Sequence, residues 1–213
     1  MRGRKKSEET RLAILSHAAE VFSERPFHEV LTDDISARLG VGKGTLYRYF
    51  ASKEDLYFAT IVHGLEGMRE AIDRCLGQPL PLDRTIESLV ATVIGYFWER
   101  RDFFVLLHRH ETKFDPAERV EWAKGREEVV RMVAERIARE MRGNGVRVNA
   151  RLAAEMLFGM IRAVCLYREE SDRAADLARL VAGVFLHGVV PAGGPRASGK
   201  VAAPRRAAAM GKG

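Results

Sequence analysis

The chain has 213 residues, of which 46% are hydrophobic and 30% are charged, and its formal net charge is +6 at pH 7. This composition is ordinary for a globular protein with one large core or two small ones. The apolar runs are too short and too interrupted to cross a membrane, and no signal-peptide core follows the basic start. We therefore expect a cytoplasmic protein with no membrane partner.

The net positive charge of the sequence comes from its two ends. Residues 1–11 hold five basic and two acidic side chains, and residues 191–213 hold five basic side chains and no acidic one. Glycine, proline, alanine and arginine dominate residues 191–213, where no periodicity survives, so a disordered basic tail is expected there. The N-terminal run is either an arm that attracts nucleic-acid phosphates or a solvated terminus.

Helical periodicity of 3.6 residues begins near the N-terminus and recurs along the chain, whereas strand signals are almost absent. A first helix is expected over residues 7–24. Four of its apolar residues share one face: Leu12, Leu15, Ala19 and Phe22.

Two short helices are expected next, over residues 33–39 and 43–49. Thr32 is the expected N-cap of the first, and Gly40 suits the left-handed conformation in which a helix ends. Two short helices joined by a turn with glycine form a helix-turn-helix, whose second helix enters the major groove of DNA.

The same turn contains Gly42-Lys43-Gly44-Thr45, which is similar to the end of a phosphate-binding loop. That motif requires an earlier glycine where Ala37 stands, and it requires a preceding strand where the periodicity is helical. A nucleotide-binding site is therefore excluded.

A long helix is expected from Ser52, an N-cap with Asp55 three residues further on, to Gly77. Its apolar stripe comprises Leu56, Ile61, Leu65, Met68, Ile72 and Leu76. Five further helices are expected. Four of them span about residues 82–100, 101–113, 150–169 and 173–190, and the remaining one, of some 26 residues, is opened by Asp115-Pro116. Asn149 is the expected cap of the helix over residues 150–169. The sequence thus predicts an all-α fold of about nine helices.

The N-terminal part resembles the DNA-binding domain of the TetR family of bacterial transcriptional regulators, over about residues 8–60. The matching positions follow one fixed order: Ile14 to Phe22, Phe27, Thr32, Ile35, Ala37, Gly40-Val41, Gly44 to Tyr47, Tyr49-Phe50 and Ser52 to Glu54. Pro26, Leu31 and Leu39 depart from the family pattern. The resemblance implies a DNA-binding domain over residues 1–51 and a ligand-binding and dimerisation domain over residues 52–190.

Lys43 and Arg48 are the long cations of the second short helix, and either side chain can bind a guanine edge. Gly44 allows the backbone to approach DNA closely. The resemblance further implies that Tyr47, Tyr49, Lys53 and Thr32 hold the phosphates. The expected DNA contacts are Thr32, Lys43, Gly44, Thr45, Tyr47, Arg48, Tyr49 and Lys53, on a double-stranded operator.

The resemblance also implies a pocket for an apolar or aromatic effector among the helices of the second domain. Expected lining residues are Phe97, Trp98, Phe103, Phe104, His108, Trp122, Met156, Met160 and Tyr167. The long helix is the expected lever between the two domains. Gly64 and Gly67 either soften that helix or are tolerated surface glycines.

The helix over residues 150–169 is apolar nearly all round, and the helix after it has an apolar face, so self-association is expected. In the family the last two helices pair in a dimer. Gly159, Gly183 and Gly188 would permit close packing. The expected homodimer contacts are Phe158, Ile161, Cys165, Val181, Val184 and Phe185.

No pattern indicates an enzyme, a cofactor or a metal site. His108 and His110 point to different faces of a helix, and Cys75 and Cys165 are expected to be reduced and buried. The expected function is a dimeric repressor that binds a palindromic operator and is released by a small effector. The alternative is a nucleoid-associated or structural DNA-binding protein of the same fold without a ligand.

Overall fold

The computed structural model describes residues 2–108, 116–141, 149–168 and 173–187, with side chains from residue 6 onward. These residues form nine α-helices, one 3-10 turn and no strand, which confirms the all-α prediction. The helices are α1 (Arg2–Glu24), α2 (Thr32–Leu39), α3 (Lys43–Tyr49), α4 (Lys53–Leu76), α5 (Leu82–Glu99), α6 (Arg101–His108), α7 (Pro116–Met141), α8 (Ala150–Tyr167) and α9 (Ala174–His187), with η1 (Phe27–Glu29) after α1. None of these helices is long and apolar enough to span a membrane.

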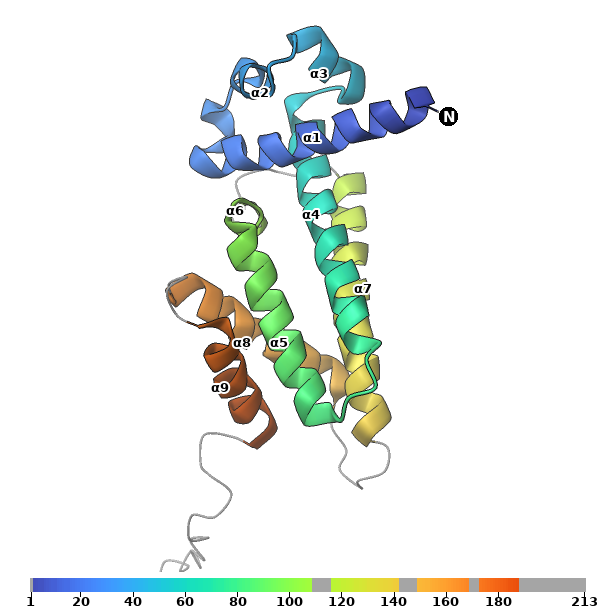
Figure 1. Ribbon diagram of the computed structural model, residues 1–213, viewed down its shortest axis with the longest axis vertical. Coiled ribbons are helices and arrows are strands. Elements are labelled where there is room, and N and C mark those ends of the chain that lie inside the picture. The colour runs from blue at the N-terminus through green and yellow to red at the C-terminus, as the bar shows by residue number, and fades with distance from the viewer. Residues whose placement is uncertain (1, 109–115, 142–148, 169–172, 188–213) are drawn as a thin grey trace, which may run out of the picture.

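Helices α1 to α3 form a small domain at one end of the molecule (Figure 1). Its core contains Ile14, Leu15, Phe22, Ile35, Leu46 and Phe50, together with the first turns of α4. Helix α1 begins at Arg2, earlier than the sequence predicts. Leu12 is 39% exposed and Ile14 is fully buried, so the prediction for Leu12 was wrong. The other three predicted residues of α1 are buried, and the buried face also includes Ile14, Ala18 and Val21.

Helix α4 runs from this domain along the body of the molecule (Figure 1). Its first turn is held as predicted: the Ser52 hydroxyl accepts the Asp55 N–H at 3.0 Å. The Asp55 carboxylate accepts the Ala51 N–H at 2.9 Å. Its apolar stripe is buried in two cores, with Ile61 in the N-terminal one and Leu65 in the second. Both cores therefore share one rigid element.

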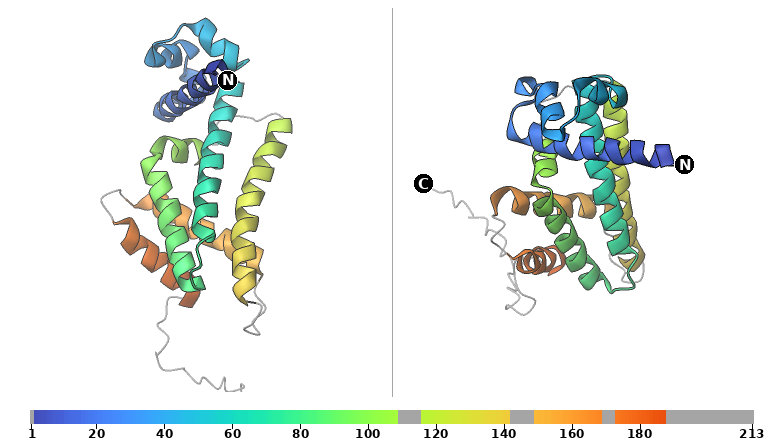
Figure 2. Two further views of the ribbon diagram at one scale, coloured as in Figure 1. Left: turned by 45° about the vertical axis from the view of Figure 1, so that its right-hand side comes forward. Right: turned by 45° about the horizontal axis from the view of Figure 1, so that its top comes forward.

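The body is built around α5, which packs against α4, α8 and α9 (Figure 2). Helix α7 lies alongside α4, and α8 crosses from α7 to α5. The Asn149 side chain caps α8 by accepting the Leu152 N–H at 3.1 Å, as predicted. The Arg151 guanidinium donates two hydrogen bonds to the Glu127 carboxylate, both 2.7 Å long, and so joins α8 to α7.

Two glycines of α4 are sites of close helix packing. A β-carbon at Gly64 would lie 2.1 Å from Cδ2 of Phe103, and one at Gly67 would lie 2.5 Å from the Tyr96 hydroxyl. The same hydroxyl donates to the Gly64 carbonyl at 2.8 Å. Gly64 is buried, so the expectation of a tolerated surface glycine is wrong for it. The softening of α4 by either glycine stays a prediction. Both positions lie where aromatic rings of α5 and α6 approach the α4 backbone closely.

Helix α6 links the body to the N-terminal domain. It packs against α1, and Leu106 is 2% exposed within the N-terminal core. Trp122 of α7 contacts both cores. A movement of α6 or α4 would therefore be transmitted to α1. The predicted tail over residues 191–213, His110 and Gly188 lie outside the described residues.

Candidate nucleic-acid interface

The turn between α2 and α3 has helix-turn-helix geometry. Gly40 adopts φ 67° and ψ 26°, the left-handed conformation predicted for it, and its N–H donates to Ala37. The Val41 N–H donates to the Ser36 carbonyl at 3.1 Å. Leu31, and not Thr32, is the N-cap of α2, so the predicted capping role of Thr32 was wrong. The turn sets α3 beside α2 at the end of the molecule that lies away from α5 to α9 (Figure 1).

Helix α3 divides into an inner and an outer face. Leu46 is 1% exposed and Phe50, which follows the helix, is 3% exposed, so both belong to the core as expected. The outer residues are exposed or half-exposed: Lys43, Gly44, Thr45, Tyr47, Arg48 and Tyr49. A β-carbon at Gly44 would meet no protein atom within 4 Å. Protein packing therefore does not require glycine there, which leaves room for an external partner.

Side-chain contacts hold the two tyrosines of this face. The Tyr47 hydroxyl lies 3.3 Å from the Thr32 hydroxyl, so α2 and α3 present both groups together. The Ser7 hydroxyl donates to the Tyr49 oxygen at 3.3 Å, which brings the N-terminal part of α1 beside α3. This hydrogen bond, and the nearby Arg48 guanidinium, lower the pKa of Tyr49. Arg48 itself lies over the Tyr49 ring, 5.3 Å from its centroid.

Lys43, the first residue of α3, is paired within the protein. Its ammonium nitrogen lies 2.8 Å from Oδ1 of Asp33 on α2. The hydrogen bond to Asp33 raises the pKa of Lys43, so the side chain is charged at neutral pH. Asp33 lies in the first turn of α2. Its contact with Lys43 depends on the angle between α2 and α3, which sequence periodicity does not reveal.

Lys53 was expected to contact phosphate, but its ammonium is engaged inside the protein. It donates to the carbonyls of Phe27 and Val30, at 2.9 Å each, and lies 4.3 Å from the centroid of the Phe27 ring. These bonds fasten the segment after α1 to the start of α4. A lysine ammonium has three donors, so one remains available to a phosphate, and the predicted contact stays a prediction.

The aromatic residues expected to line an effector pocket form a filled core instead. Phe97, Phe103 and Phe104 are between 2% and 5% exposed, and their rings pack with centroids 5.0–6.1 Å apart. The His108 ring lies 4.2 Å from that of Phe104 and is fixed by a 2.8 Å hydrogen bond to the Phe104 carbonyl. The rings fill the space between the helices. The 3.6-residue pattern of the sequence predicts that these side chains are buried, but it does not distinguish a filled core from the lining of a pocket.

The remaining expected pocket residues divide between the core surface and the outside. Trp98, Trp122 and Met160 pack against the second core. Met156 is 59% exposed and Tyr167 is 84% exposed, so assigning them to an internal pocket was wrong. The indole N–H of Trp98 is buried and has no hydrogen-bond acceptor among the described residues.

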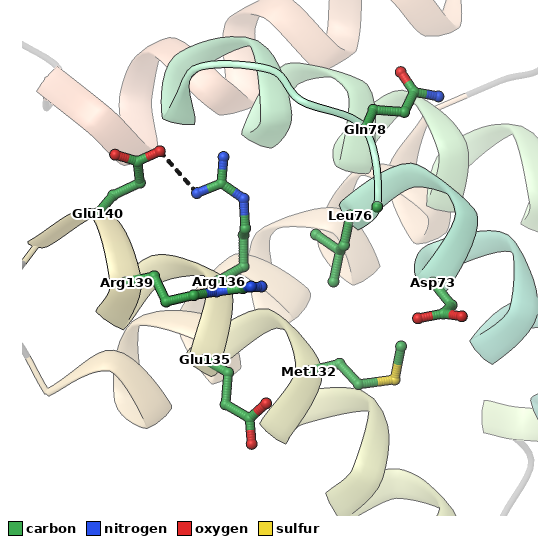
Figure 3. A pocket seen from close by; sticks show the side chains of 9 residues that line it. Asp73, Leu76, Gln78, Met132, Glu135, Arg136, Arg139 and Glu140 are labelled. Carbon is green, nitrogen blue, oxygen red and sulfur yellow. Dashed lines mark hydrogen bonds and ion pairs between the residues drawn. The ribbon is translucent and has the colours of Figure 1, made fainter.

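A surface pocket of about 560 Å³ lies elsewhere, between the end of α4 and the end of α7 (Figure 3). Its lining is largely polar: Asp73, Leu76, Gly77, Gln78, Met132, Glu135, Arg136, Arg139 and Glu140. Arg136 is buried and donates to the Leu80 carbonyl at 2.6 Å and to Glu140 at 2.9 Å. None of the residues expected around an effector lines this pocket, and its charged wall does not suit a largely apolar molecule.

Helix α8, with the neighbouring α9, has an exposed apolar face. Leu152, Met156 and Leu166 are 40–59% exposed and lie on one side of α8, and Leu180 of α9 is 62% exposed. We call these four residues, with Gly159 between them, the α8–α9 face. A β-carbon at Gly159 would meet no protein atom within 4 Å.

Three of the expected dimer contacts lie on the opposite side of these helices. Ile161, Cys165 and Val181 are at most 5% exposed within the second core, so assigning them to an interface was wrong. Phe158, Val184 and Phe185 are half-buried. A helix that is apolar all round has no period from which its inner and outer sides can be told.

Comparisons with known proteins agree with this geometry. Residues 14–60 match the family model described as bacterial regulatory proteins, tetR family. The HTH-type transcriptional activator FasR of Mycolicibacterium smegmatis is 35% identical over 69 residues, which cover 32% of this chain and 32% of that relative. The chain thus spans about a third of the length of this curated relative.

Solved structures resemble most of the chain. The TetR family regulator PfmR from Thermus thermophilus aligns with a TM-score of 0.74 and 23% identity, over 83% of this chain and 98% of that one. FadR from Bacillus subtilis, solved in complex with stearoyl-CoA, aligns with a TM-score of 0.73 and 16% identity, over 84% and 99%. Identities this low show the shared fold alone. The helix-turn-helix over α2 and α3 thus lies within the segment, residues 14–60, that matches the model of the tetR family of bacterial regulatory proteins.

Proposed function

We propose that the protein is a transcriptional repressor that binds a palindromic operator as a homodimer and is released by a small, largely apolar effector. The observation that carries the DNA-binding part is the outer face of α3. There, two cations and two tyrosines surround a glycine whose missing side chain leaves open space. Such a face fits the major groove, because arginine and lysine bind guanine edges while hydroxyl groups hold phosphates. The protein would act where the chromosome lies, in the cytoplasm.

The α8–α9 face supports the homodimer. Apolar side chains exposed in a row on one helix are stabilised when a second copy covers them, and a twofold axis brings the same row from the partner. Gly159 would let the two α8 backbones approach each other. A twofold dimer also presents two recognition helices to successive half-sites, about 34–36 Å apart, which is what a palindrome requires.

The effector part is supported by Trp98. A buried N–H without an acceptor costs roughly 1–3 kcal/mol. An effector with a carbonyl or carboxylate oxygen at this place would recover that free energy in the ligand-bound state. Because α4 and α6 both join the body to α1, a shift of the aromatic core around Phe103 would reach the DNA-binding end. The ligand can shift this equilibrium only by its differential affinity for the two states.

A second candidate is a ligand-independent DNA-binding protein of the same fold. The aromatic core of Phe97, Phe103 and Phe104 favours this candidate, since the three rings are at most 5% exposed and pack directly against one another. Both candidates share the DNA-binding face and the dimer, so only an effector experiment separates them.

The DNA-binding part is tested by selecting bound sequences from random duplex DNA. The selected sites should be palindromic, and Arg48→Ala should weaken binding by about 1–3 kcal/mol per half-site and relax the preference at one base pair. Arg74→Ala is the matched control, because Arg74 is exposed and lies in the last turn of α4. Wild-type protein that selects no sequence would refute the proposal.

The dimer is tested by Met156→Glu, measured with light scattering. A carboxylate in the α8–α9 face should yield a folded monomer, because Met156 is already 59% exposed in the single chain. Val120→Glu is the matched control: Val120 is 54% exposed on α7 and should leave the dimer intact. A wild-type protein that is monomeric at micromolar concentration would contradict the interface.

The effector is tested with Trp98 fluorescence in a Trp122→Phe variant, which leaves one tryptophan. Stearoyl-CoA is the first probe, because the similar FadR structure contains it. Quenching that saturates and coincides with operator release supports the effector. A panel of acyl thioesters and apolar carboxylates that leaves both signals unchanged favours the ligand-independent candidate.

A further inference from the structure

The two acids at the start of α2 have different partners. Asp34 accepts a hydrogen bond from the Arg25 guanidinium at 2.7 Å and one from the Leu31 N–H at 3.3 Å. Asp33 instead lies 2.8 Å from the ammonium of Lys43, and both side chains are more than half exposed. Asp33 is thus an exposed carboxylate of α2 that lies beside Lys43, the cation that begins α3.

Stability does not explain a carboxylate at this place. An exposed ion pair contributes little to folding because water screens it. Asp34 already provides the negative charge that the N-terminus of α2 favours. Toward DNA the charge of Asp33 is unfavourable, because it repels phosphates and neutralises Lys43. The carboxylate therefore weakens sequence-independent attraction to DNA.

The ion pair matches the edge of one base pair. In the major groove a G·C pair presents guanine O6 and N7 as acceptors and the cytosine amino group as a donor. Guanine O6 and the cytosine amino nitrogen are hydrogen-bonded to each other, so they lie about 2.9 Å apart. The Lys43 nitrogen and Asp33 Oδ1 are a donor and an acceptor at 2.8 Å, in the complementary order.

We propose that Asp33 and Lys43 act as one unit that reads a G·C base pair in each half-site of the operator. The Lys43 ammonium donates to guanine O6 or N7, and the Asp33 carboxylate accepts from the cytosine amino group. Asp33 also restrains a flexible lysine that would otherwise bind the nearest phosphate of any sequence. Asp33 is then a specificity-determining residue. This inference rests on the proposed DNA-binding function.

The test compares Asp33→Asn, Lys43→Ala and the double variant on all single-base variants of a half-site selected from random duplex DNA. Both single variants should lose preference at the same base pair, and that pair should be G·C. The loss should be roughly fivefold or more, the usual discrimination at one contacted position. The double variant should lose no more preference than either single one, because the two side chains form one contact.

Two further variants separate specificity from general charge. Glu29→Gln removes one negative charge from the same domain, where Glu29 is exposed and lies 3.7 Å from His28. It should leave the base preferences unchanged. Asp33→Glu keeps the charge but moves the carboxylate by one methylene, so it should lower the G·C preference. Asp33→Asn should also bind random-sequence duplex more tightly than Glu29→Gln does, by about two- to fivefold.

Two results would overturn this inference and leave the proposed function intact. In the first, Asp33→Asn keeps every base preference; in the second, it loses preference at a different base pair from Lys43→Ala. Preference lost by both variants at an A·T pair would overturn it as well. If the wild-type protein selects no DNA sequence, both the proposed function and this inference are refuted. Circular dichroism of Asp33→Asn should show unchanged helicity, because Asp34 and Arg25 still hold the start of α2.

Discussion

The packing of α4 against α6 gives a sharp prediction for Gly64→Ala. A new methyl group at Gly64 would lie 2.1 Å from Cδ2 and 2.4 Å from Cε2 of Phe103. Non-bonded carbon atoms prefer about 3.5–4.0 Å, so the ring or the helix must move by more than about 1 Å. The Phe103 ring cannot yield freely, because it is stacked with Phe97 and meets the Tyr96 ring edge-on.

The magnitude follows from two opposing terms. Alanine is favoured over glycine inside a helix by about 1 kcal/mol. Overpacking a filled core costs about 1–3 kcal/mol, and a clash with a fixed ring lies at the upper end of that range. Gly64→Ala should therefore lower the free energy of unfolding by about 2 kcal/mol. For a chain of this size the melting midpoint should fall by roughly 4–8 °C.

Gly95→Ala is the matched control within a helix of the same body. A β-carbon at Gly95 would meet no protein atom within 4 Å, so only the helix term applies. This variant should melt about 2–4 °C above the wild type. Thermal unfolding followed by circular dichroism measures both variants. If Gly64→Ala were as stable as Gly95→Ala, the close approach of Phe103 to α4 would be refuted.

The remaining predictions concern three polar groups that the fold has enclosed. Lys53→Ala should destabilise the protein by about 1–2 kcal/mol in urea denaturation, because two carbonyls lose a charged donor. An unchanged urea midpoint would show that these bonds are not formed in solution. Arg136→Ala should cost about 3 kcal/mol or more, since Leu80 and Glu140 lose a buried partner; a midpoint close to the wild type in the same assay would contradict its burial. Burial raises the pKa of the Cys165 thiol to about 11, above the 9.0 of a free thiol. The neutral thiol is therefore favoured by folding, and its contribution to stability is complete below about pH 9 and is lost as the pH rises toward about 11. A Cys165→Ser variant should lack this alkaline loss, and an identical decline in both proteins over that pH range would assign it to other groups.

Local signals in the sequence predicted most helix boundaries correctly. Ser52 and Asn149 cap α4 and α8 as expected, and Gly40 ends α2 in the left-handed conformation. These features depend on residues a few positions apart, so propensity and spacing suffice to predict them. The outer face of α3 was predicted in the same way, because Leu46 and Phe50 are the apolar residues that must turn inward.

Predictions that needed the direction of a helix face were less successful. Leu12 and Ile161 are both apolar, yet Leu12 is 39% exposed and Ile161 is 1% exposed. Helix α8 is apolar nearly all round, so its pattern does not tell which side meets α5 and α7 and which side stays exposed. The aromatic residues of α5 and α6 presented the same difficulty, since a filled core and a pocket lining share one pattern.

The class of the fold, the order of the helices and the place of the helix-turn-helix could all be inferred from local patterns of residues. Caps, turns and periodicity act over a few residues, and their free energies do not depend on distant parts of the chain. Three-dimensional packing fixed which side of each helix is buried, that Gly64 must be glycine, and that Asp33 holds Lys43. These contacts join residues on different helices, and the crossing angles that create them are set by packing of the whole core.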